Sequence, residues 1–296
     1  MSQVPAHDPL TAQLLQRCRL RMAQGRRPVI GLNGPVGAGK TTLCRQLQQA
    51  FADAGLQLAV ASIDDAYLAW PERQSRMAGN PFGVSRVPPG SHDPEALLEP
   101  ILRWRAQPWL GEGIATAQLQ LPRFDKTLMA GEGDRIAPWS GQADALLLEG
   151  WLLGCRPLAS AGLDAWSVQA DLDPGAQQWL HRSNQALEAY QPLWDTLDGL
   201  MMLWPSSWRL PRRWRLQAEA KQRRQGGGWL QAEQLERIVQ ATLQSLPPEL
   251  FMQPLLERAC WVRELDGRRR CRWQGTGDAM VHRLDQASSS CSSATG

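Results

Sequence analysis

The segment that most constrains this chain is GPVGAGKT at residues 34–41, which lies between an apolar run and a helical pattern. It fits the phosphate-loop motif G-x-x-x-x-G-K-[ST] in full. The apolar run PVIGLNG precedes it, and Leu43, Leu47 and Phe51 follow it at helical spacing. A second apolar run covers residues 58–63. Strand, glycine loop, helix and strand in this order predict a parallel βαβ unit. We therefore expect an α/β fold with a mostly parallel sheet flanked by helices.

This segment predicts a nucleotide site, because glycines let backbone N–H groups and a helix N-terminus face a phosphate. The nucleotide-binding residues are expected to be Gly34, Pro35, Val36, Gly37, Ala38, Gly39, Lys40, Thr41 and Thr42. Lys40 would bridge the β- and γ-phosphates as a catalytic cation, and the Thr41 hydroxyl would be a magnesium ligand. A glycine-rich turn without a ligand is the alternative, which the flanking strand and helix disfavour. ATP and Mg²⁺ are the expected cofactors.

Composition excludes several classes of protein. The 296 residues are 43% hydrophobic and 21% charged, as in a soluble globular protein of one or two domains. No apolar stretch approaches the roughly 20 residues that span a bilayer, and the first residues lack a signal-peptide core, so we expect a cytoplasmic protein without a membrane partner. The six cysteines are scattered, which favours reduced thiols. A net charge of +3 is too small to imply nucleic acid.

The chain divides into an N-terminal helix (1–27), a main domain (28–265) and a terminal strand with a disordered tail (266–296). Within the main domain, residues 71–143 form an insertion with few strand signals, in which a helix is expected at 94–105. Further strands are predicted around residues 146–148 and in the segments WSVQADLD and DGLMMLW. The segment CWVRELDGRRRCRW predicts a terminal hairpin because Asp-Gly favours a tight turn. The serine-rich tail cannot bury apolar surface.

Three carboxylates follow predicted strands. Asp64 and Asp65 lie in SIDDAYL after the second strand, and Glu149 ends the third strand within LLLEGW. The adjacent pair can hold a metal, accept a proton or cap the next helix. Adjacent side chains of an extended strand point to opposite faces, so we assign Asp64 to an acceptor hydroxyl as a base. Asp65 is assigned to the substrate side, through magnesium-bound water, or to local structure. Glu149 is assigned to magnesium, with capping of the strand end as the alternative.

The insertion supplies candidate groups for binding an acceptor. PGSHDPEALL carries His92 and Asp93, although Ser91 or Asp93 can instead cap the following helix. LPRFDKTLMAGEGDR carries Arg123, Lys126 and Arg135 on a predicted glycine-bearing loop, for which a solvated charged loop is the alternative. The chain has 29 Arg and only three Lys, at 40, 126 and 221. Because arginine is used at nearly every basic position, each of the three lysines suggests a site that needs a compact ammonium group.

A basic helix with three glycines, WRLPRRWRLQAEAKQRRQGGGW, is predicted within residues 206–229. We interpret it as a cationic lid over a triphosphate, with Arg215 and Lys221 as lid residues and glycines 226–228 as a hinge. The alternative is a nucleic-acid surface on which Trp204, Trp208, Trp214 and Trp229 stack bases. The local extent of the charge and the presence of Glu219 disfavour that alternative.

The ordered set GPVGAGKTT, SIDDAYL, PGSHD, LPRFDK with GEGDR, LLLEGWLLG and WRLQAEAK resembles the D-glycerate 3-kinase family of plants, cyanobacteria and fungi. That family is similar to the uridine kinase, phosphoribulokinase and pantothenate kinase group of P-loop kinases. The resemblance implies transfer of phosphate from ATP to D-glycerate, giving 3-phosphoglycerate in photorespiratory salvage. It also implies that Asp64 is the base of a D-x-x-Y motif with Tyr67, and that His92, Asp93 and Arg135 bind the acceptor. Ala66 departs from the expected aromatic residue.

Glycerate is a small anion, so Arg123, Lys126 and Arg135 have a carboxylate to bind. Two alternatives to a glycerate kinase stay open. One is a related kinase with another acceptor, similar to uridine or pantothenate kinase. The other is an ATP-dependent assembly factor or RNA-associated ATPase, whose hydrolysis would ignore small alcohols. A GTPase switch is disfavoured because none of the three lysines lies in an N-K-x-D motif.

Overall fold

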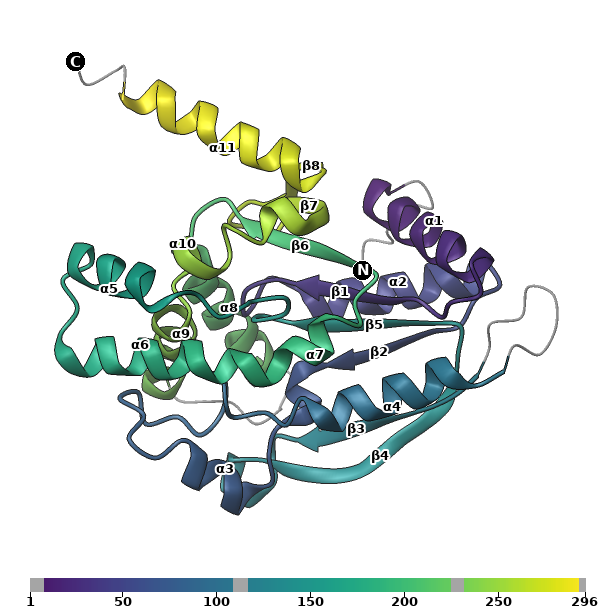
Figure 1. Cartoon of the computed structure of the whole chain (residues 1–296), viewed down its shortest axis with the longest axis horizontal. Coiled ribbons are helices and arrows are strands. Elements are labelled where there is room, and N and C mark those ends of the chain that lie inside the picture. Colours follow the sequence, from purple (N-terminus) through teal and green to yellow (C-terminus); the bar gives the residue numbers. More distant parts are fainter. Residues whose placement is uncertain (1–7, 109–116, 225–231, 293–296) are drawn as a thin grey trace.

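The chain folds around a six-stranded sheet with the strand order β2-β5-β1-β6-β7-β8 (Figure 1). The computed structural model describes residues 8–108, 117–224 and 232–292. The strands of this sheet are β1 (Val29–Asn33), β2 (Leu58–Ser62), β5 (Ala145–Gly150), β6 (Gly199–Pro205), β7 (Ala259–Leu265) and β8 (Cys271–Gly275). All neighbours pair in parallel except β7 and β8, which form the predicted terminal hairpin. The predicted class, a mostly parallel α/β sheet, is confirmed.

The sheet is covered on both faces, which explains why its strands read as continuous apolar runs. In β5, Leu146 and Leu148 face one buried cluster, while Ala145 and Leu147 face the other. Helices α1 (Pro9–Ala23) and α2 (Lys40–Asp53) contribute to the second cluster. The first cluster receives α4 (Glu95–Ala106), α6 (Pro174–Ala186), α7 (Gln191–Trp194), α9 (Ala232–Ser245), α10 (Pro248–Phe251) and α11 (Gly277–Ser292).

The insertion contains a long two-stranded hairpin, β3 (Ala117–Asp125) and β4 (Asp134–Ala143), beneath α4 in Figure 1. The predicted shortage of strands in this region was wrong. The sequence AQLQL alternates buried and exposed side chains along β3, which is the period of a half-buried strand. The predicted glycine-bearing loop was wrong in part, because Arg123 lies in β3 and Arg135 in β4. The short connection between the two strands includes the turn η2 (Met129–Gly131). Helix α3 (Trp70–Arg76) also lies in the insertion.

Two predictions of local structure were wrong. The segment WSVQADLD belongs to helix α5 (Ser160–Gln169) and the turn after it, and not to a strand. There Leu163 and Ser167 are buried one turn apart, while Val168 is 82% exposed. The expected disordered tail is helical as far as Ser292, because the start of α11 has an apolar stripe. Met280 is fully buried, and Leu284 packs against the same core.

The remaining elements are short turns, apart from the helix that follows β6. They are η1 (Ile63–Ala66), η3 (Leu187–Tyr190), η4 (Leu256–Arg258) and α8 (Leu210–Arg224). In the part of the chain that the structure describes, no helix is both long enough and apolar enough to cross a membrane.

Candidate active site

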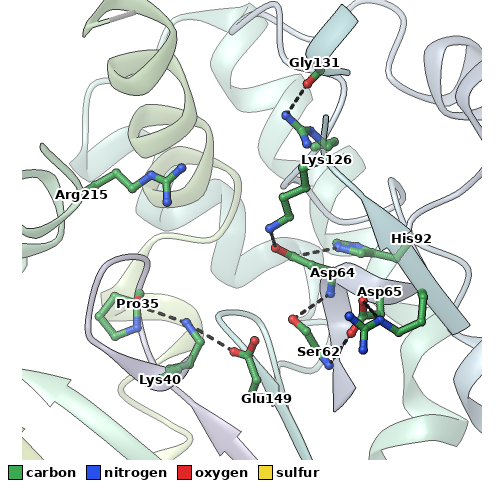
Figure 2. Close-up of polar contacts among 12 residues, drawn as sticks. Pro35, Lys40, Ser62, Asp64, Asp65, His92, Lys126, Gly131, Glu149 and Arg215 are labelled. Atoms are coloured by element: carbon green, nitrogen blue, oxygen red, sulfur yellow. Dashed lines mark hydrogen bonds and ion pairs between the residues drawn. The ribbon is translucent and has the colours of Figure 1, made fainter. Parts of the chain in front are cut away.

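A cleft of about 710 Å³ opens where β1, β2 and β5 end. Its wall contains the phosphate-loop residues Val36, Gly37, Gly39, Lys40, Thr41 and Thr42, together with Asp64, Asp65, Arg123, Lys126, Glu149, Arg215 and Arg269. The cleft thus brings together most of the residues that the sequence predicted, at the edge where ligands of open α/β sheets bind. Figure 2 shows Lys40 and Glu149 on one side of this space and Asp64 with Lys126 on the other.

The phosphate loop ends at Gly39, whose φ of 95° is left-handed and suits glycine. Helix α2 begins at the next residue, Lys40, so its first N–H groups and its positive dipole end face the cleft. The Lys40 ammonium donates hydrogen bonds to the carbonyl oxygens of Gly34 at 2.8 Å and Pro35 at 3.3 Å. Its nitrogen lies 3.7 Å from Oε2 of Glu149. This geometry gives an anion site with an ammonium and a carboxylate at its mouth.

Gly37 is required by close packing as well as by its φ of 76°. A Cβ at this position would lie 2.9 Å from the backbone nitrogen of Arg215 and 2.9 Å from Cβ of Trp214. Both of these residues belong to α8, the predicted lid helix. The start of α8 is therefore fixed against the phosphate loop, and fully buried Trp214 anchors it further by donating from Nε1 to the Gly267 carbonyl at 3.2 Å.

The two neighbouring aspartates turn apart because the chain leaves β2 in the 3₁₀ turn η1. Asp65 accepts a hydrogen bond from the Ser62 backbone N–H at 3.1 Å, and Ser62 Oγ accepts one from the Asp64 N–H at 3.2 Å. This reciprocal pair is a capping box. Asp65 thus stabilises the turn, and Arg123 lies 3.6 Å from its other oxygen. Both aspartates line the cleft, and the Asp64 carboxylate points toward Lys126 (Figure 2).

Asp64 lies between two basic side chains. Lys126 Nζ donates to Oδ2 of Asp64 at 2.6 Å, and His92 Nε2 lies 3.8 Å from Oδ1. Burial alone would raise the pKa of Asp64, but the charge of Lys126 and the contact with His92 hold the pKa well below its ordinary value of 3.8. Burial raises the pKa of Asp65. The surroundings of Asp64 therefore lower its pKa, whereas those of Asp65 raise its pKa. Asp64 is the carboxylate that stays ionised to lower pH.

The acceptor segment around His92 packs behind Asp64. Tyr67 and His92 form an isolated antiparallel bridge, and their rings stack at 4.3 Å between centroids. Both side chains are buried, and neither lines the cleft. Arg135 pairs with Asp93 at 2.8 Å and donates to the Tyr67 carbonyl at 2.9 Å, also outside the cleft lining. The acceptor-binding role of these four residues stays a prediction. Their observed contacts include one another and Asp64, and His92 also contacts Tyr190.

The lid prediction covers residues of which the structure describes only a part. Arg215 lines the cleft and pairs with Glu219 at 2.8 Å. Lys221 lies in α8, but its side chain, the glycines 226–228 and Trp229 lie outside the described residues. The tryptophans proposed to stack bases are otherwise engaged in packing: Trp204 and Trp214 are buried, and Trp208 packs against the core.

Two site residues were missed by the sequence analysis. Arg269, in the β7–β8 turn, donates from Nε to the Gly37 carbonyl at 2.7 Å and from Nη2 to the Trp214 carbonyl at 2.7 Å. Tyr190 in η3 contacts His92 at 2.8 Å. The Asp-Gly turn in the sequence located the hairpin of Arg269, but nothing in it distinguished the middle arginine of Arg268, Arg269 and Arg270.

The residues present fit a magnesium ion, because a hydroxyl and a carboxylate are the hard oxygen donors that Mg²⁺ takes alongside phosphate. The Thr41 hydroxyl and the Glu149 carboxylate line the same cleft, beside the phosphate loop. Among the described residues these two are the groups that we expect to hold it, directly or through water.

The sheet, the phosphate loop and the cleft at the strand ends define the chain as a P-loop kinase in fold. Its structure is similar to that of D-glycerate 3-kinase from Cryptococcus neoformans, with a TM-score of 0.75 and 25% sequence identity, covering 90% of this chain and 97% of that one. In sequence it is 31% identical over 220 residues to the chloroplast D-glycerate 3-kinase of Arabidopsis thaliana. The predicted resemblance to D-glycerate 3-kinases is confirmed.

The sequence matches differ in extent. The alignment with the Arabidopsis protein covers 71% of this chain and 45% of that protein, so the chain spans about half the length of this relative. An uncharacterised kinase of Schizosaccharomyces pombe, mug58, is 28% identical over 207 residues, which are 66% of this chain and 71% of that protein. The family of the methylmalonyl-CoA mutase-associated GTPase MeaB matches residues 1–68, the part that contains the phosphate loop.

Proposed function

We propose that this chain phosphorylates D-glycerate with ATP and Mg²⁺. The observation that carries the proposal is the Asp64 carboxylate, which faces the phosphate loop across the cleft with Lys126 2.6 Å from its Oδ2. A base and a cation next to a nucleotide site are what transfer of a phosphoryl group to a small anionic alcohol requires. The similarity to two D-glycerate 3-kinases supports the choice of acceptor.

The step assigns one task to each group. Asp64 takes the proton of the acceptor hydroxyl while that oxygen forms a bond to the γ-phosphorus of ATP. The bond from this phosphorus to the β–γ bridging oxygen breaks, and its electron pair leaves with ADP. Lys40 and the N-terminus of α2 stabilise charge on the transferred group. The magnesium ion, held by Thr41 and Glu149, would neutralise phosphate charge.

The charge of the cleft favours an anionic acceptor. Arg123 and Lys126 come from the end of the β3–β4 hairpin and line the cleft beside Asp64. Their side chains are 49% and 58% exposed, so a substrate carboxylate can reach both. Arg123 lies beside Asp65 and Lys126 pairs with Asp64, and a substrate carboxylate would add an anionic partner that a neutral nucleoside lacks. Attack by the 3-hydroxyl and a role in photorespiratory salvage are proposals that follow from the family resemblance. The cytoplasmic location expected from the sequence stays a prediction.

The GTPase name of the family that matches residues 1–68 suggests a second nucleotide, and GTP hydrolysis is therefore part of the test. Beyond the phosphate loop the chain has lysine only at positions 126 and 221, and neither lies in an N-K-x-D motif for reading guanine. Adenine is the expected base.

The experiment is a coupled assay of ADP or GDP release with D-glycerate, L-glycerate, uridine, pantothenate and ribulose 5-phosphate as acceptors. We expect D-glycerate alone to raise nucleotide turnover above the rate without acceptor, and ATP to be preferred to GTP. Turnover with another acceptor and none with D-glycerate would refute the proposal. Hydrolysis that no acceptor changes would favour an ATP-dependent assembly factor.

A further inference from the structure

The only two tyrosines of the chain both contact His92. Tyr67 stacks on its ring, and the hydroxyl of Tyr190 lies 2.8 Å from its Nδ1. Tyr190 is fully buried and follows His92 by 98 residues, so the contact depends on the tertiary fold. Neither tyrosine lines the cleft.

The hydrogen bonds around Tyr190 indicate which ring nitrogen of His92 carries the proton. The Tyr190 oxygen accepts a hydrogen bond from the Gly90 N–H at 3.1 Å. Ser91 directs its own proton to the Pro88 carbonyl at 2.6 Å, so it does not use that proton on His92. A Tyr190 hydroxyl that donates to Nδ1 satisfies both buried groups. The reverse arrangement leaves the Tyr190 proton without an acceptor among the described contacts.

With Nδ1 as the acceptor, the ring carries its proton on Nε2. That nitrogen is buried and makes no hydrogen bond at normal distance, and Oδ1 of Asp64 lies in front of it at 3.8 Å. Burial lowers the pKa of His92, and the charges of Lys126 and Arg73 lower it further against the opposing effect of Asp64. His92 is therefore a neutral N–H donor at pH 7, and Lys126 is the charged partner of Asp64.

We propose that Tyr190 is a positioning residue for phosphoryl transfer: its hydroxyl holds His92 as the Nε2–H tautomer and thereby aims a donor at Oδ1 of Asp64. Lys126 holds Oδ2, so the two contacts together fix the orientation of the carboxylate that receives the substrate proton. If the ring carried its proton on Nδ1, Nε2 would present a lone pair to the carboxylate and repel it. This inference rests on the proposed function, in which Asp64 is the base.

The first test is the tautomer itself, measured by long-range ¹H–¹⁵N NMR of the histidine rings in the full chain. The chain has four histidines, at 7, 92, 181 and 282, and His92→Gln assigns the signal. We expect the Nε2–H form at pH 7, and a shift toward the Nδ1–H form in Tyr190→Phe. That variant removes one oxygen and keeps the ring stacked on Trp194. An Nδ1–H or doubly protonated His92 in the unchanged protein would overturn the proposal.

Ser91→Ala is the matched control, because Ser91 Oγ also approaches Nδ1, at 3.4 Å. Its proton is engaged elsewhere, so its removal should leave the His92 tautomer unchanged. A change of tautomer in Ser91→Ala that equals the change in Tyr190→Phe would mean that Tyr190 does not set the tautomer.

The second test is kinetic. Tyr190→Phe should lower kcat by roughly 10-fold to 100-fold, by analogy with a metal-ligating histidine that loses its orienting partner. The KM for ATP should stay within about twofold, because the phosphate loop is untouched. The acid limb of kcat should move to higher pH, because Asp64 loses a donor to its ionised form. An unchanged kcat and acid limb would contradict a positioning role. The NMR measurement needs no acceptor, so it stands even if D-glycerate proves not to be the substrate.

Discussion

Asp64 and Asp65 show how one turn of the backbone separates two identical side chains. Asp65 caps η1 through the Ser62 N–H, and Asp64 faces the cleft with Lys126 and His92. The sequence located both acids at the end of a strand and assigned them different roles. It placed them on an extended strand, however, with capping of the next helix as an alternative. The 3₁₀ turn follows from the capping box that Asp65 forms with Ser62. Tyr190 had no sequence signal, because its contact with His92 arises only on folding.

Asp64→Asn should lower kcat by about 10² to 10⁴ while the affinity for ATP stays nearly constant, since a general base acts on the acceptor alone. Asp65→Asn is the matched control: it keeps an oxygen that can accept from the Ser62 N–H, so it should lower the free energy of unfolding by less than about 1 kcal/mol, with a smaller loss of kcat. Steady-state kinetics and urea unfolding measure both. If Asp65→Asn lost more activity than Asp64→Asn, the two roles would have to be exchanged.

Lys126 is the largest influence that lowers the pKa of Asp64 against burial. In Lys126→Met that charge is gone and burial remains, so the pKa of Asp64 should rise. As the pH is lowered, Asp64 would then become protonated at a pH where the unchanged protein keeps it ionised. The decrease of kcat/KM on the acid side would therefore begin at a higher pH. Lys126→Arg should retain most of this charge effect and still raise the KM for glycerate. Identical acid limbs in Lys126→Met and the unchanged protein would contradict the pairing.

At the scale of elements, the site depends on three segments that meet at the phosphate loop. The start of α8 packs against Gly37, and the β7–β8 turn reaches both through Arg269. The sequence predicted the loop, the basic helix and the hairpin as separate elements. Their junction was not predictable, because Arg268, Arg269 and Arg270 are equivalent in sequence and only Arg269 is turned inward, with a φ of 61°.

Arg269→Met should raise the KM for ATP several-fold and lower the melting temperature, because two carbonyl oxygens lose their donor. The KM for the acceptor should change little. Arg268→Met is the control, since Arg268 is exposed and its neighbour Asp266 bonds to its backbone N–H rather than to its side chain. Equal changes in the two variants would show that general loss of positive charge, and not the contact with Gly37, affects nucleotide binding.

At the scale of the whole molecule, the sheet separates two buried hydrophobic clusters, and each supports a different part of the site. The cluster with α1 and α2 supports the phosphate loop, and the cluster with α4, α6 and α7 supports the acceptor side, where Tyr190 meets His92. Buried apolar runs and the glycine loop were enough to predict this class of fold. Helix α11 was not predicted, because it is stabilised by burying Met280 and by packing against η4 and β7 rather than by its serine-rich sequence.

The most direct test of the account is the identity of the product. The full chain is incubated with ATP, Mg²⁺ and D-glycerate, and the reaction is followed by ³¹P NMR with Asp64→Asn as the parallel control. We expect 3-phosphoglycerate and ADP in equal amounts from the unchanged protein, and little of either from Asp64→Asn. Release of inorganic phosphate at the same rate with and without D-glycerate, and no phosphorylated glycerate, would contradict it.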